Sequence, residues 1–243
     1  MAILLKNGMV YQGRDFVRAD VRIKDGVIEC IGTDIEEKGA RIVDVSGRWL
    51  VPGFLDIHTH GAVGVDVNAA KAEDYEKICR FHASQGTTGW LCSVLTDTRE
   101  QTLWCIEEYK RWKSLEHKGS RLLGIHLEGP FLSPEYKGAM PEHLLQRPNV
   151  GLVQEYQEAA GGEIRYITVS PEIEGMADFI PELCRLGMVV AIGHSGADYE
   201  TARQAIANGA RGATHTSNAM RLLHQHEPAI WGAVLEDDRV FCE

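Results

Sequence analysis

From Pro52 onward, short apolar stretches alternate with longer amphipathic stretches, and this alternation restricts the possible folds more than any other feature of the sequence. The expected strands are residues 53–59, 88–95, 121–127, 164–170, 188–192 and 212–215. The expected helices between them are residues 72–85, 99–116, 150–160, 175–186 and 199–208. Strands that alternate with helices run parallel and are joined by right-handed crossovers. The sequence therefore predicts an α/β fold with a parallel sheet.

The number of these segments indicates an incomplete barrel. They make about six strand–helix units, and residues 239–242 begin a seventh strand. A barrel of eight such units, the TIM (β/α)8 barrel, takes about 250 residues by itself, whereas fewer than 200 residues follow position 50 here. We therefore expect a partial TIM barrel, and we expect the chain to be a fragment of a longer protein.

Residues 1–50 have a different pattern. Their short β-rich runs are separated by Asn7-Gly8 and Asp25-Gly26, dipeptides that favour tight hairpin turns. We expect residues 1–50 to form a small antiparallel domain, an incomplete β-sandwich, and residues 51–243 to form the incomplete barrel domain.

The charge balance excludes two classes of partner. The chain has 25 basic and 35 acidic residues and a net charge of −10, so we expect no nonspecific binding to nucleic acid or to an anionic membrane. No apolar stretch approaches the roughly 20 residues of a membrane span, and no secretory signal peptide is evident. The six cysteines form no CxxC pair, which is typical of free thiols in a reducing cytoplasm.

The segment Asp56-Ile57-His58-Thr59-His60-Gly61 closes the first expected barrel strand. Because side chains alternate along a strand, His58 and His60 point to the same face. Two imidazoles at this spacing can ligate one metal ion. The alternative is that they are polar residues at a strand end that form only hydrogen bonds.

Three further strands end in a side chain that can ligate a metal. Glu128 follows residues 121–127, while His194 and His215 lie at the ends of two later strands. Each alone could be a solvated loop carboxylate or a structural histidine, but parallel strands bring their carboxyl ends together. Imidazole and carboxylate ligands suit zinc, iron, manganese or cobalt. We therefore predict a site for one or two divalent ions, whereas His126, one step deeper than Glu128, is expected in the core or behind the ligands.

Four motifs carry a resemblance to a known family: residues 52–61 (PGFLDIHTHG), 126–132 (HLEGPFL), 193–195 (GHS) and 214–220 (THTSNAM). Together they resemble the N-acetylglucosamine-6-phosphate deacetylase family, within the amidohydrolase superfamily. The resemblance implies metal-dependent hydrolysis of the N-acetyl group of N-acetylglucosamine 6-phosphate, which yields glucosamine 6-phosphate and acetate. It also implies a homodimer for the full-length protein.

The same resemblance assigns roles to individual positions. It implies that Glu128, His194 and His215 hold the principal ion and that His58 and His60 hold a second one.

The resemblance also names residues that contact substrate. It puts Asn218 and the backbone of Ala219 at the substrate phosphate. His226 stands where many members have arginine, and Met140 stands where members have a substrate-contacting histidine or a glutamine. The alternatives are an exposed loop histidine and a methionine that packs on the barrel mouth.

The family's catalytic aspartate follows the eighth strand, beyond Glu243. We expect no catalytic residue within the chain, because the carboxylates of residues 216–243 are expected in loops rather than at a strand end. These loop carboxylates are Glu227, Glu236, Asp237 and Asp238. The chain alone is then expected to be inactive. The alternatives are another N-acyl amidohydrolase, or an inactive metal-binding fragment that lacks the aspartate.

Overall fold

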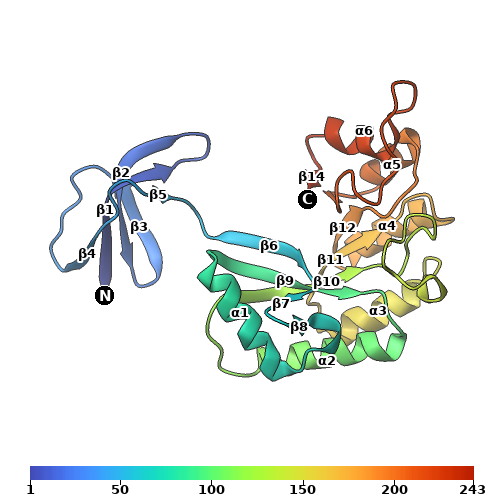
Figure 1. The fold of residues 1–243 in the computed structure, drawn as a ribbon, viewed down its shortest axis with the longest axis horizontal. Coiled ribbons are helices and arrows are strands. Elements are labelled where there is room, and N and C mark those ends of the chain that lie inside the picture. Colours follow the sequence, from blue (N-terminus) through green and yellow to red (C-terminus); the bar gives the residue numbers. More distant parts are fainter. The chain divides into compact units, whose positions relative to one another are not determined.

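The computed structural model describes all 243 residues, which form two compact units, Met1–Gly53 and Phe54–Glu243 (Figure 1). The first unit is a β-sheet, and the second combines parallel strands with helices. No helix of either unit is long and apolar enough to cross a membrane.

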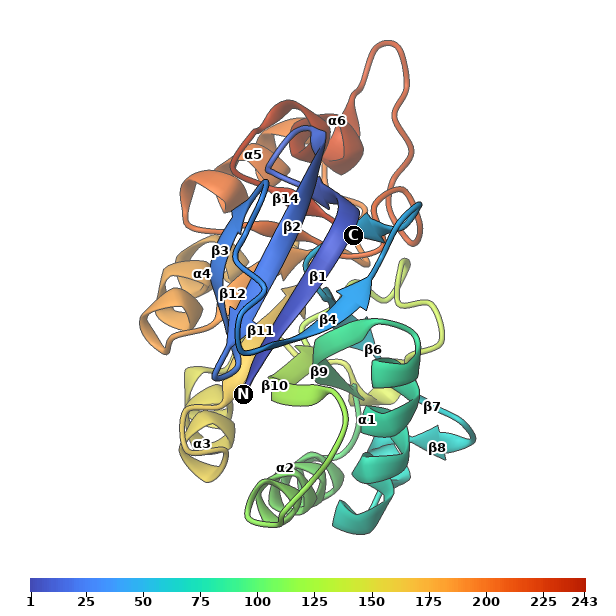
Figure 2. The same ribbon diagram turned by 90° about the vertical axis from the view of Figure 1, so that its left-hand side faces the viewer.

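The first unit is one five-stranded sheet that contains β1 as an inner strand (Figure 2). Its strands are β1 (Ala2–Tyr11), β2 (Phe16–Lys24), β3 (Val27–Gly32), β4 (Ala40–Asp44) and β5 (Trp49–Leu50). β1 pairs antiparallel with β2 but parallel with β4 and β5. The expectation of a purely antiparallel domain is therefore wrong: the segment between β3 and β4 returns the chain so that β4 runs in the direction of β1. These residues form a single layer, so they do not by themselves make a sandwich.

Asn7-Gly8 does not form the expected hairpin turn. It lies inside β1, where Asn7 has a φ of 66° and the pairing with β2 shifts register between Leu5 and Gly8. The result is a β-bulge. A Cβ on Gly8 would lie 2.8 Å from the Leu50 side chain, so a larger residue here would require Leu50 to shift. Asp25-Gly26 does join β2 to β3, with positive φ values of 51° and 83° that suit a type I′ turn.

The second unit is built on a seven-stranded sheet in the order β14-β13-β12-β11-β10-β9-β6. Its strands are β6 (Phe54–Thr59), β9 (Thr87–Leu95), β10 (Arg121–Glu128), β11 (Ile164–Val169), β12 (Val189–Ile192), β13 (Gly212–Ala213) and β14 (Phe241–Cys242). All neighbouring pairs are parallel. The predicted α/β class with a parallel sheet is therefore confirmed, and the carboxyl ends of all seven strands lie along one edge.

Helices follow the strands and pack against the sheet (Figure 1). They are α1 (Tyr75–Ser84), α2 (Arg99–Lys113), α3 (Val150–Ala159), α4 (Met176–Arg185), α5 (Tyr199–Ala207) and α6 (Ala229–Glu236). Shorter elements are β7 (Gly61–Ala62), β8 (Val65–Asp66) and the 3-10 helices η1 (Val67–Ala69), η2 (Ala72–Asp74) and η3 (Glu142–Leu144). The first five helices coincide with expected ones, but α6 was not anticipated, and Glu236 belongs to it rather than to a loop. Its Ile230 and Val234 are buried, which explains why an apolar run after Pro228 forms a helix.

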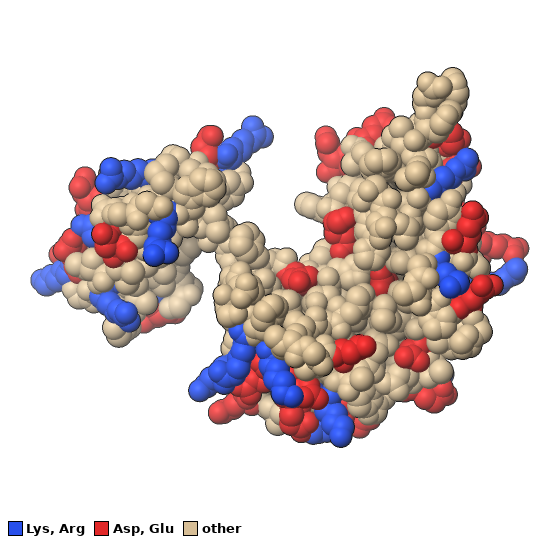
Figure 3. All heavy atoms as spheres, in the orientation of Figure 1, with Lys and Arg blue, Asp and Glu red and all other residues tan.

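The core of the second unit lies between the sheet and its helices. Trp90 of β9, Tyr109 of α2 and Ile125 of β10 are fully buried there. The outer surface carries basic and acidic side chains close together (Figure 3), including the ion pairs of Arg80 with Glu76 and of Lys77 with Asp74 on and before α1. The apolar side chains of the strands and helices form this core, whereas the carboxyl ends of the strands carry polar side chains.

Candidate metal centre

Four histidine side chains, from the ends of three strands, converge on the carboxylate of Glu128 at the end of a fourth. The Nε2 atoms of His194 and His215 lie 3.0 and 2.9 Å from Oε1 of Glu128. The Nε2 atoms of His58 and His60 lie 3.2 Å from Oε1 and 3.1 Å from Oε2 of the same carboxylate. The four imidazoles therefore surround Glu128, whose side chain is only 2% exposed.

The donor atoms form two groups that could each hold a metal ion and that share Glu128. One group is His58, His60 and Glu128, and the other is Glu128, His194 and His215. Within each group the ligand atoms lie within 4.8 Å of one another. The Nε2 atoms of His58 and His60 are 3.2 Å apart and both face the carboxylate. Imidazole nitrogens that share a carboxylate fit a divalent transition metal, so the donor set suits such an ion.

Three of the four rings are oriented through their second nitrogen. Nδ1 of His60 lies 3.0 Å from the carbonyl oxygen of Ser93, and Nδ1 of His194 lies 2.9 Å from that of Tyr136. Nδ1 of His58 lies 3.2 Å from the Glu243 carboxylate. With Nδ1 turned toward an acceptor, Nε2 of each ring faces Glu128, which is the orientation of a histidine that ligates a metal through Nε2.

The first histidine pair is positioned by the end of one strand, where the register with β9 shifts between Asp56 and Thr59. His58 and His60 come from the end of β6, where the Asp56 carboxylate accepts the backbone N–H of His58 at 3.1 Å. Thr59, between them, donates its N–H to the Ser93 hydroxyl of β9 at 3.0 Å. A hydrogen bond to β9 therefore fixes the end of β6, which carries both rings.

The second pair is positioned by strained loop backbone. His194 and His215 follow β12 and β13, and both have left-handed φ values, 47° and 54°. Such a conformation costs a non-glycine residue about 1–3 kcal/mol and persists where surrounding contacts enforce it. Here the Ser170 hydroxyl donates to the carbonyl of His194 at 2.6 Å, and Glu172 accepts the Ser195 hydroxyl at 2.7 Å.

The electrostatics of the centre favour an ionised Glu128. Burial alone would raise the pKa of this carboxyl, but hydrogen bonds from the four histidines hold it far below its usual range. Burial alone would lower the pKa of His58, but its hydrogen bonds with Glu128 and Glu243 raise it to about 9. The Glu128 carboxylate is therefore ionised at neutral pH.

His126 lies beneath the centre rather than in it. It is fully buried, and its ring nitrogens lie 2.9 Å from the hydroxyls of Ser93 and Thr168. Thr168 continues the chain of hydrogen bonds to Thr214 at 2.8 Å, and the His126 ring packs edge-on against His58 at 4.6 Å. Burial holds the pKa of His126 well below its usual value, so the ring stays neutral.

The residues that the resemblance assigned to substrate lie in two loops. Asn218 and His226 are exposed, and Met140 is 3% exposed. No hydrogen bond joins the side chains of Met140, Asn218 or His226 to the five converging residues. The carbonyl of Ala219 accepts the backbone N–H of Ser195 at 2.9 Å, which ties the loop after His215 to the loop after His194.

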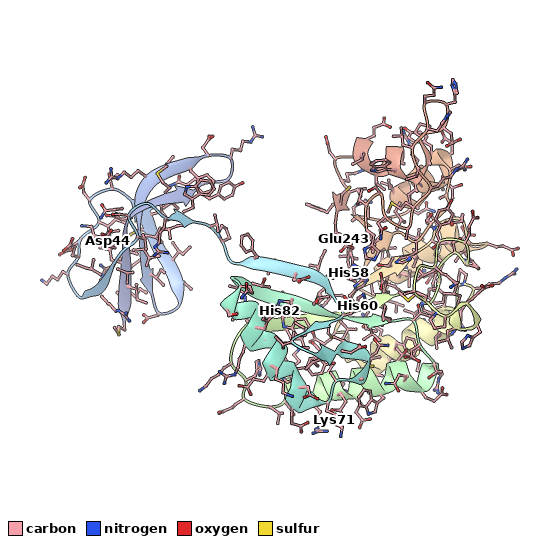
Figure 4. The ribbon with its side chains drawn as sticks, viewed as in Figure 1. Asp44, His58, His60, Lys71, His82 and Glu243 are labelled. Atoms are coloured by element: carbon pink, nitrogen blue, oxygen red, sulfur yellow. The ribbon has the colours of Figure 1, made fainter.

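Glu243 was missed by the sequence reasoning. It directly follows β14, at the same edge of the sheet as the other strand ends, and Figure 4 shows its side chain next to His58. The expectation that no carboxylate of residues 216–243 ends a strand is therefore wrong. The signal that could have found it is its place directly after the apolar run of the seventh strand.

No protein-family model matches the chain. The chain is 31% identical to an N-acetylglucosamine-6-phosphate deacetylase of Lysinibacillus sphaericus, over 100% of this chain and 63% of that protein. It is 30% identical to an N-acetylgalactosamine-6-phosphate deacetylase of Escherichia coli O157:H7, over 92% and 58% of the two chains. The solved structure of a Mycobacterium smegmatis N-acetyl-D-glucosamine-6-phosphate deacetylase mutant with N-acetyl-D-glucosamine-6-phosphate has a TM-score of 0.90 and 31% identity, over 99% of this chain and 62% of that one. The chain thus spans about three fifths of the length of the curated relatives it matches.

Proposed function

We propose that this chain, a partial-length relative of the N-acetylglucosamine-6-phosphate deacetylases, is the metal-binding part of an enzyme that removes the acetyl group from N-acetylglucosamine 6-phosphate. The products are glucosamine 6-phosphate and acetate. The observation that carries the proposal is the convergence of four imidazole Nε2 atoms on the buried Glu128 carboxylate.

In this proposal Glu128, His194 and His215 hold the principal ion, and His58 and His60 share Glu128 with a second. Zinc, iron, manganese and cobalt all suit these ligands. Such an ion polarises the carbonyl oxygen of an amide and makes water more acidic.

The chain's own residues prepare the site for an amide. The contacts of Nδ1 with Ser93, Tyr136 and Glu243 keep the Nε2 atoms directed inward, so little reorganisation is needed when substrate enters. Of the aspartates, Asp56 is the one whose carboxylate forms a hydrogen bond with any of the five ligands. It accepts the backbone N–H of His58. We therefore assign no proton-transferring residue within this chain.

For the substrate phosphate we propose Asn218 and the backbone of Ala219, with His226 as a cationic partner from the following loop. Asn218 and His226 are exposed, which suits contact with a ligand. The burial of Met140 supports a packing role for that side chain instead.

We further propose that the seven strands belong to an eight-stranded barrel of which this chain makes about six units, that the enzyme is a homodimer and that it is cytoplasmic. The six free cysteines suit a reducing compartment. The dimer rests on the family resemblance alone.

A second candidate substrate is N-acetylgalactosamine 6-phosphate, because one relative at 30% identity bears that activity in its name. The phosphate and acetamide are common to both sugars, so the five ligands do not discriminate between them. The hydroxyl contacts that would discriminate must come from elsewhere in the site.

Metal uptake and sugar binding test the proposal together. The chain is dialysed against zinc, manganese or cobalt, or against iron(II) without oxygen, and metal per chain is measured before calorimetry with each phosphosugar and with N-acetylglucosamine. We expect metal-dependent binding that requires the phosphate, and acetate release at a rate about 10²–10⁴-fold below that of a complete relative, since a positioned proton shuttle contributes that much. The proposal fails if the chain takes up no divalent metal, or if the loaded chain binds neither phosphosugar.

A further inference from the structure

Of the four histidines around Glu128, His58 is the one whose Nδ1 faces an ionisable side chain, and that side chain is Glu243. Its Oε2 lies 3.2 Å from Nδ1 of His58 (Figure 4). The two side chains are 19% and 9% exposed, so the contact is largely shielded from water. A charged acceptor in such a place makes a stronger hydrogen bond than a neutral one.

Glu243 is itself held in place from two directions. The Tyr166 hydroxyl of β11 donates to Oε1 of Glu243 at 3.3 Å. The backbone N–H of Glu243 donates to Ala213 at 3.1 Å, and its carbonyl accepts the N–H of Thr216 at 2.8 Å. The backbone of Glu243 is therefore hydrogen-bonded to residues before and after His215. The strand that precedes Glu243 lies at the opposite edge of the sheet from β6, which carries His58.

Tyr166 is suited to remain the donor. It is 5% exposed, and burial together with the charge of Glu243 keeps its pKa well above the ordinary value, so the phenol stays protonated. Gly212 makes room for the ring, since a Cβ there would lie 2.2 Å from the Tyr166 hydroxyl oxygen. The carboxylate therefore has one oxygen for Tyr166 and one for His58.

His60 and His194 have backbone carbonyls in the corresponding role. Backbone acceptors are present whatever the side chain, whereas the acceptor of His58 depends on the identity of residue 243. The orientation of the His58 ring is therefore the one part of the centre that a single distant side chain controls.

We propose that Glu243 is a positioning residue: its carboxylate takes the Nδ1–H of His58, directs Nε2 toward Glu128, and so determines how tightly the group of His58, His60 and Glu128 holds its ion. This inference rests on the proposed metal centre and adds a residue to it. Removing such an orienting partner typically weakens metal binding 10–100-fold.

The test is a cobalt(II) titration of the chain, followed by visible absorption and by metal stoichiometry after dialysis. Glu243→Ala is expected to weaken one of two equivalents about 10–100-fold and to leave the other unchanged. Glu243→Gln keeps an oxygen acceptor and is expected to lose less than about tenfold, and Tyr166→Phe less still. Glu236→Gln, an exposed carboxylate of α6 that accepts the Tyr199 hydroxyl, is the matched control and should bind like the wild type.

The outcomes separate this inference from the one beneath it. If the wild type takes up no cobalt, the metal centre itself is wrong. If the wild type binds cobalt and Glu243→Ala binds it with the same stoichiometry and affinity, Glu243 has no positioning role although the centre stands. A loss spread equally over both equivalents, or one that Glu243→Gln does not rescue, also overturns the proposal, because it would reflect general damage to the strand.

Discussion

The two histidine pairs around Glu128 reach the same carboxylate by opposite routes. His58 and His60 are two residues apart at the end of β6, so the short stretch of chain between them keeps both rings close together. His194 and His215 come from separate strands, and each needs left-handed backbone to aim its ring. Local geometry makes the first pair, whereas only the parallel order of β12 and β13 makes the second.

The difference also concerns where strain is stored. In the second pair the strained residues are the ligands themselves. Next to the first pair, the first non-glycine residue with left-handed backbone after His60 is Val63, in the hairpin that follows. Strain at a ligand can be part of preorganisation, whereas strain in a neighbouring turn can be removed without touching the ligands.

The largest effect is expected from the residue that the two pairs share. Glu128→Gln removes the charge that both groups use, so both equivalents of metal should be lost, each by on the order of 100-fold or more. Metal per chain after dialysis is the measurement. Glu108→Gln is the matched control, because Glu108 is a buried carboxylate that accepts the Ala72 N–H far from the ligands. Retention of either equivalent by Glu128→Gln would contradict a shared carboxylate.

Single histidine variants should separate the pairs. His60→Ala and His194→Ala each remove one nitrogen, and each is expected to weaken one equivalent on the order of 100-fold while the other equivalent changes much less. Competition with a chelating dye resolves the two affinities. If each variant weakened both equivalents equally, the pairs would act as one site and the comparison would collapse.

The layer beneath the first pair can be broken without changing a ligand. His126→Phe deletes the hydrogen bonds of the ring with the Ser93 and Thr168 hydroxyls, and each such bond contributes about 0.5–1.5 kcal/mol. We expect a lower free energy of unfolding in urea. His126→Gln should recover part of the loss, and equal stability of the Phe variant and the wild type would show that the network contributes nothing.

A histidine without a carboxylate partner should respond to pH in the opposite sense to His58. His82 of α1 is 6% exposed, its Nε2 has no partner, and burial lowers its pKa. The unfolded chain then binds a proton that the folded chain resists, so stability should fall as pH drops below about 6.5, by at most about 1.4 kcal/mol per pH unit for one proton.

The check on His82 is the difference in unfolding free energy between the wild type and His82→Phe, measured from pH 7.5 to 5. The variant should gain on the wild type as the pH falls. A difference that stays constant over this range would exclude His82 as a source of acid sensitivity.

The smallest effect should come from the strained turn beside the first pair. Val63 and Gly64 have φ values of 50° and 80°, close to those of Asp25 and Gly26 in the first unit. Because a left-handed β-branched residue costs about 1–2 kcal/mol, Val63→Asn should stabilise the chain by about 1 kcal/mol without changing metal affinity. Asp25→Val is the converse and should destabilise by a similar amount. Thermal unfolding tests both, and a destabilised Val63→Asn would mean that the valine side chain contributes packing that outweighs its strain.

The sequence predicted the α/β class, the parallel sheet and the convergence of His58, His60, His194 and His215 with Glu128. It did so because strand periodicity and the position of a residue at a strand end are local properties that survive folding. It failed where an outcome depends on distant partners. Asn7-Gly8 forms a bulge within β1, where Leu50 lies close to Gly8, and the residues after Pro228 form α6, whose apolar side chains are buried.

The sequence alone determined which residue types stand at the strand ends, and hence that imidazole and carboxylate ligands would be available for a metal. The tertiary structure alone decided how those ligands are aimed. It gave His194 and His215 their left-handed backbone. It also buried His126 against Ser93 and brought Glu243 to His58, and each of these contacts is between residues of different strands. Such contacts leave no local periodicity, because 185 residues separate Glu243 from His58. Glu243 follows β14 and His58 lies in β6, the two opposite edge strands, and only the curvature of the sheet brings them together.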